Sequence, residues 1–148
     1  MFDRIKSRKI VKNTIKDVAK FLQELNTLDV YPRADVTQIE VIYIALNTFF
    51  LSLHKKEELS ELVINEYIRI KDAQFLDDFY RDIINGFNKE CFRILQEDLS
   101  KEFSSDGMTK CYLHINNYIC ETLQIKLSSA DIIAAVDCML FTRRKDCV

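Results

Sequence analysis

The stretch VIYIALNTFFLSL, residues 41 to 53, decides the fold because apolar side chains surround it on nearly every side. As a helix it is about 20 Å long, too short for the roughly 30 Å hydrocarbon core of a membrane. Asn47 also interrupts the apolar run. We therefore predict a central core helix over about 36–54, with neighbouring elements packed on nearly every side.

The start of this helix carries a capping signal, because Asp35 is followed three residues later by Gln38. Pro32 keeps the preceding segment in a loop. One thin polar strip follows the helix at seven-residue spacing: Glu40, Asn47 and His54. The ends of the strip are about 21 Å apart along the axis, so they cannot serve one site.

The composition points to long helices and short loops. The chain has 148 residues with only two Gly and one Pro, whereas average usage would give roughly ten and seven. Hydrophobic residues make up 48% and charged residues 30%, which is typical of a globular protein with one sizeable core. We predict an all-α fold in which residues 1–148 form a single helical domain, a compact bundle of about six helices.

Apolar spacing places the other helices around the central one. The expected ranges are about 9–28, 57–70, a segment after the N-cap Asp72 to about 103, 109–126, and a segment from the cap Ser128 to about 145. In the segment after Asp72 the apolar stripe rotates by more than a quarter turn near Gly86, which predicts a kink, a break, or one long helix that changes packing partner. A turn over 104–108, with Gly107 in a left-handed conformation, is expected to end it.

The five cysteines, at positions 91, 111, 120, 138 and 147, form no C-x-x-C pair, and no secretory signal follows the basic start of the chain. Reduced thiols and a cytoplasmic location are expected, although the basic amphipathic start is also compatible with a mitochondrial presequence. We expect residues 145–148 to fray and Cys147 to be exposed. Arg143, Arg144 and Lys145 complement the negative end of the last helix dipole, which we prefer to a role in nucleic-acid binding.

A metal site suggests itself in TKCYLHINNYICE, residues 109 to 121. On one helix Cys120 lies about half a turn around from Cys111 and about 13 Å along, so these two and His114 cannot bind one zinc ion. A site that joins Cys111 and His114 to Cys91 or Cys138 stays open. The simpler interpretation is a buried thiol at Cys111 and a boundary histidine at His114. We predict no bound metal or cofactor.

Several catalytic signatures are excluded by residue counts. Gly86 and Gly107 are the only glycines, so a Walker loop, a G-x-G-x-x-G turn and a G-x-S-x-G elbow are absent. His54 and His114 are the only histidines, so H-E-x-x-H and paired E-x-x-H motifs are absent as well. The acidic runs KKEELSE and LDDFYRD are typical of solvated helix faces, with Mg²⁺ binding as the alternative. We predict that the protein is not an enzyme.

Charge is unevenly distributed, with a net +4 over residues 1–33 and −7 over residues 34–106. The first helix carries a candidate basic surface: Lys9, Lys12, Lys16 and Lys20. Such a surface is a candidate for anionic lipid or nucleic acid, but it has no aromatic residue to stack a base or anchor in a membrane, and a solvated face is the preferred interpretation.

The preferred function is a helical interaction or regulatory module that associates with a protein partner or with itself as a homodimer. A second apolar stripe needs a second packing surface, and this candidate association face is Phe92, Leu95, Leu99 and Phe103. The alternative is a bundle that encloses a small apolar ligand or a cofactor such as haem, with His54, His114 or a cysteine as ligand.

Overall fold

The computed structural model describes residues 2–101 and 106–148, with side chains described for 2–98 and 110–148. The all-α prediction is confirmed, because six α-helices, one short 3₁₀ turn and no strand occupy these ranges. The elements are α1 (Phe2–Thr27), α2 (Val36–Leu53), α3 (Glu57–Ile70), η1 (Gln74–Leu76), α4 (Asp77–Lys101), α5 (Asp106–Leu123) and α6 (Ala130–Cys147). The buried apolar side chains of these helices form one core.

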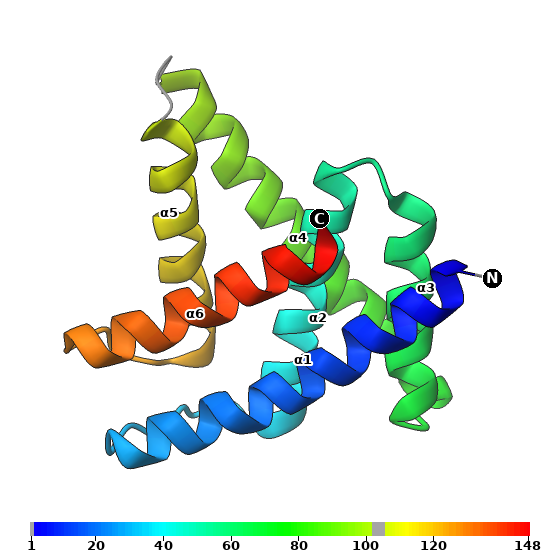
Figure 1. The fold of residues 1–148 in the computed structure, drawn as a ribbon, viewed down its shortest axis with the longest axis horizontal. Helices are drawn as coiled ribbons and strands as arrows, with labels where there is room; N and C mark the ends of the chain where they lie inside the picture. Colours follow the sequence, from blue (N-terminus) through cyan, green and yellow to red (C-terminus); the bar gives the residue numbers. More distant parts are fainter. Residues whose placement is uncertain (1, 102–105) are drawn as a thin grey trace.

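Helix α2 is the central helix that the sequence predicts. It contacts α1, α3, α4 and α6, and Figure 1 shows it in the middle of the bundle. Every side chain from Ile39 to Leu51 is buried. Asp35 and Gln38 form the expected capping box at its start. By length and composition α2 could also cross a membrane, yet 72% of it is buried inside the protein, which is how the core helix of a bundle looks.

Helix α4 runs without a break through Gly86, so the predicted break is wrong, and one long helix changes its packing partner along its length. Asn88 donates to Thr48 of α2, and further along Asp98 contacts His114 of α5. A Cβ at Gly86 would meet no other atom within 4 Å, so this glycine lies on an open side of the helix. Figure 1 shows the end of α4 and the start of α5 extending away from α1 and α3.

Several predicted helix ends are wrong by a few residues. Asp72 does not cap α4, because it adopts a left-handed φ of 50° that ends α3, and η1 intervenes. Of the turn predicted over 104–108, residues 104 and 105 lie outside the described part of the chain, and Gly107 belongs to the first turn of α5 rather than to a left-handed turn. Helix α5 ends at Leu123, where Gln124 takes a left-handed φ of 56°. Ser129, not Ser128, caps α6 by accepting from the Ile132 N–H.

The predicted position of the first helix and the predicted fraying of the C-terminus also need correction. Helix α1 begins at Phe2 rather than near residue 9. Helix α6 continues to Cys147, whose side chain is fully buried and donates to Asn47 Oδ1 over 3.5 Å. Burial raises the pKa of the Cys147 thiol to about 12. One side of the last turn of α6 therefore belongs to the core, because Cys147 packs onto α2.

Candidate interaction surface

A groove lies between α5 and α6, the two helices that cross beside the α5–α6 loop (Figure 1). It has a volume of about 510 Å³ and is lined by Lys110, Tyr112, Leu113, Asn116, Asp137, Phe141 and Arg144. Leu113 is 52% exposed and Phe141 is 50% exposed. Large apolar side chains are exposed here because α5 and α6 have faces that no other part of the described chain covers.

A series of aromatic rings runs from this groove through α2 to α4. The ring centroids of Phe92 and Phe49 lie 4.9 Å apart, and those of Phe49 and Phe50 lie 5.4 Å apart. The row continues from Phe50 to Tyr112 over 6.2 Å and from Tyr112 to Phe141 over 6.0 Å. We call these five residues the aromatic row. Phe49 and Phe50 are buried in the core and Tyr112 is partly buried against it, whereas the two ends of the row, Phe92 and Phe141, are exposed. Three of these four contacts are edge-to-face, a geometry that stabilises a ring pair by about 0.5–1.5 kcal/mol beyond the burial of its surface.

Two charged side chains of α6 in the groove, Asp137 and Arg144, contact residues of α5. The Arg144 guanidinium stacks over the Tyr112 ring at 5.4 Å. Buried Asn116 donates from Nδ2 to Asp137 Oδ1 over 2.5 Å, and its own Oδ1 has no partner among the described residues. Neither Asp137 nor Arg144 forms an ion pair with any side chain of residues 2–98 or 110–148. From α6 the groove thus presents one carboxylate and one guanidinium beside exposed apolar surface, and Lys110 of α5 also lines it.

The predicted association face on α4 is only partly described. Phe92 is 37% exposed and forms one end of the aromatic row, while Leu95 is partly buried against the core. The Leu99 side chain and Phe103 lie outside the described residues. The structure therefore links the first residue of this predicted face to the α5–α6 groove, a connection that the sequence did not suggest.

The predicted basic surface is exposed along one side of α1. Lys9, Lys12, Lys16 and Lys20 all belong to this side, and their role stays a prediction.

The structure shows how far the two cysteines and the histidine of residues 109–121 are buried. Cys111 and Cys120 are buried, which raises the pKa of each thiol to about 11. His114 is half exposed, and its Nδ1 lies 2.7 Å from Asp98 Oδ2. Within residues 2–98 and 110–148, no group of three His, Cys, Asp or Glu side chains is placed to hold a metal ion. The prediction of a buried Cys111 is confirmed.

The polar strip of α2 is distributed over separate contacts, as its length requires. Glu40 is buried, accepts from the Tyr67 hydroxyl over 3.0 Å and lies 2.7 Å from Lys71 Nζ. Asn47 is buried in another network, and His54 is exposed at the end of α2. These side chains stabilise the fold and do not converge on a site.

Arg143 is not a surface cation at the helix end, so that prediction is wrong. Its side chain is fully buried. It donates to Thr14 Oγ1 over 2.5 Å and to Asp17, and Asp146 Oδ2 lies 3.1 Å away. Asn47 Nδ2 also donates to Thr14 Oγ1, over 2.7 Å. The sequence contains a signal for this burial, because Arg143 continues the apolar stripe of α6 at helical spacing.

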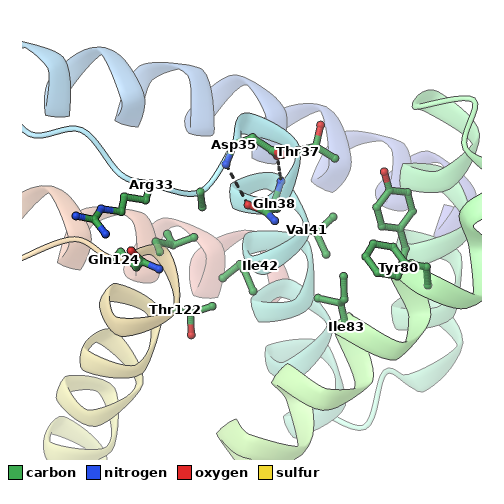
Figure 2. Close-up of a pocket in the computed structure, with 13 residues that line it drawn as sticks. Arg33, Asp35, Thr37, Gln38, Val41, Ile42, Tyr80, Ile83, Thr122 and Gln124 are labelled. Carbon is green, nitrogen blue, oxygen red and sulfur yellow. Dashed lines mark hydrogen bonds between the residues drawn. The ribbon is translucent and has the colours of Figure 1, made fainter.

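A second cavity, shown in Figure 2, lies between the start of α2, the first half of α4 and the end of α5. Its volume is about 440 Å³. Val41, Ile42 and Ile83 form an apolar wall, whereas Arg33 and Gln124 lie at the opposite end. Sequence reasoning missed this cavity because its walls come from segments far apart in the chain.

No family model, no curated protein and no solved structure matches this chain.

Proposed function

We propose that the protein is a non-enzymatic association module whose partner is a second copy of itself. The observation that carries this proposal is the aromatic row, which ends in half-exposed Phe141 at a groove beside exposed Leu113. Exposed aromatic side chains at the edge of a groove are typical of residues that dominate binding energy at interfaces. No catalytic signature in the sequence competes with this interpretation.

The charge of the groove supports pairing between identical surfaces. Asp137 and Arg144 are of opposite sign and lie in the same groove. An interface between two copies related by a twofold axis needs such self-complementarity, because each residue must find its partner on the same surface. Five free cysteines and no disulfide also fit a module that works in a reducing, cytoplasmic environment.

The test is sedimentation of the reduced protein over a wide concentration range. We expect the mass to rise reversibly from that of the 17.4 kDa chain to that of a dimer. Phe141→Glu should raise the concentration at which half of the protein is dimeric, because it places a charge in the apolar contact. Phe75→Glu is the matched control, since Phe75 is 84% exposed and lies outside the aromatic row.

The predicted face on α4 is tested in the same experiment. If Phe92→Glu dissociates the dimer and Phe141→Glu does not, the association face is the one predicted from α4. A wild-type protein that stays monomeric at every concentration would contradict self-association altogether.

The cavity of Figure 2 favours a second candidate function, the binding of a small amphiphile. Its volume lies within the roughly 300–1,000 Å³ of ordinary ligand sites, and an apolar wall faces an end with Arg33. We propose a single-chain carboxylate as the ligand, with dodecanoate as the probe. Dodecanoate should raise the melting temperature of the wild type. Ile83→Trp should abolish this shift by filling the cavity, and the exposed control Ile5→Trp should not.

A further inference from the structure

The face of α6 that borders the α5–α6 groove carries a stripe of side chains that are exposed or partly exposed. At about 100° per residue its members fall within about 80° of arc. They are Ile133, Asp137, Phe141, Arg144 and Val148. Ile133, Phe141 and Val148 are 39%, 50% and 61% exposed. The buried side chains of α6 lie on the other side of the helix. The stripe therefore joins exposed Ile133 and Val148 to the three α6 residues of the groove in one accessible contact surface.

The order of residues in this stripe is self-complementary when two copies run in opposite directions. With the twofold axis beside Phe141, Asp137 of each copy lies opposite Arg144 of the other. In the same register Ile133 lies opposite Val148. A parallel alignment would instead place Asp137 opposite Asp137 and Arg144 opposite Arg144, and like charges across an interface oppose association.

We infer that two copies of this chain pair antiparallel along α6, with Phe141 at the axis and an Asp137–Arg144 ion pair on each side. This inference rests on the proposed self-association and adds its surface and register.

Contacts within one chain prepare both charged groups for this pairing. Asn116 holds Asp137 through Oδ1, which leaves Oδ2 for a partner. The Arg144 guanidinium stacks on the Tyr112 ring, 5.4 Å from the ring centroid. Stacking occupies the flat face of the guanidinium, so its N–H groups can still donate to a carboxylate. No ion pair among the described residues has to break before these groups meet a second copy.

The size of the contact predicts a weak dimer. From Ile133 to Val148 the stripe is about 22 Å long. A single helix pair of this length falls at or below the roughly 1,200 Å² that marks the small end of specific interfaces. We therefore expect association that depends on concentration and on salt, with the charges setting the register more than the affinity.

The test is a charge exchange measured by sedimentation. Arg144→Asp and Asp137→Arg should each raise the dissociation constant at least about tenfold, because each creates two like-charge pairs. The double variant Asp137→Arg/Arg144→Asp should return it to within about threefold of wild type, since the pairs are restored with reversed sign. Lys145→Asp is the matched control. It makes the same charge change one residue along, outside the stripe, and should leave the dissociation constant within about threefold.

A second measurement does not depend on reversing charges. Carbodiimide couples a carboxylate to a lysine amine but not to a guanidinium, so Arg144→Lys should give a covalent dimer whose cross-linked peptide joins residues 137 and 144. Mixing isotopically labelled and unlabelled chains identifies the link as one between copies.

The outcomes separate the two proposals. A wild-type dimer that the single reversals leave unchanged, or that gives no link between residues 137 and 144, overturns the α6 register and leaves self-association standing. Folded single variants that dissociate while the double variant does not recover also overturn the ion pairs. A wild-type protein that is monomeric throughout overturns self-association itself.

Discussion

Replacing Arg143 with methionine removes the centre of the buried network between α6 and α1. The guanidinium bonds Thr14 and Asp17 and lies 3.1 Å from Asp146. Removing one member of a buried ion pair costs about 3–5 kcal/mol. The Asp17 and Asp146 side chains are 25% and 23% exposed, so water screens part of the loss and we expect about 3 kcal/mol.

That loss is large against the roughly 5–15 kcal/mol of a typical domain. It corresponds to a fall of about 10 °C in melting temperature for a chain of this size. The assay is equilibrium unfolding in guanidinium chloride followed by far-UV circular dichroism, under reducing conditions. Lys145→Met, an exposed change on the same turn, should stay within about 0.5 kcal/mol.

A double-mutant cycle isolates the ion pair from the packing of the side chain. Arg143→Met combined with Asp17→Leu should cost less than the sum of the two single changes, because it leaves no uncompensated carboxylate at Asp17. A loss below about 1 kcal/mol for Arg143→Met, with no coupling to Asp17, would refute the account of this network.

Three further predictions concern the thiols, the acid dependence and the central helix. Iodoacetamide should alkylate Cys138 alone in the native protein, because the other four thiols, Cys147 included, are buried; intact-mass measurement checks this, and rapid labelling of Cys147 contradicts its burial. Arg69 holds the pKa of Glu66 below its ordinary value of 4.5, so this stabilisation is complete above pH 4.5 and is lost as pH falls through the lowered value; Glu66→Gln should flatten that part of the stability profile. Asp35→Ala should destabilise the protein by about 1 kcal/mol while Asp35→Asn, which keeps the cap, should cost far less; equal losses in urea titration would argue against the capping box.

The architecture was predictable because patterns of residues close together in the sequence determine where its helices form. The apolar run of α2 and its Asp35–Gln38 cap depend only on nearby residues, and both are confirmed. Helix ends were less predictable where a residue with positive φ decides them. Asp72 and Gln124 both adopt left-handed conformations. Aspartate is enriched in this region among residues other than glycine, whereas glutamine gives no such signal.

The candidate site was harder to predict because it depends on which helices meet. Phe92 was identified from spacing alone, but its link to Phe141 passes through rings of α2 and α5 that only the fold brings together. Arg143 was assigned to the surface because arginine near a helix end ordinarily lies there. Its burial depends on Thr14 and Asp17, more than a hundred residues away in the chain.

The most direct test of the central claim is the mass of the reduced wild-type protein by sedimentation equilibrium, measured from low to high concentration. Self-association through α6 predicts a reversible shift from monomer to dimer that weakens as salt is added. A mass that stays at the 17.4 kDa of a single chain at every concentration would contradict it.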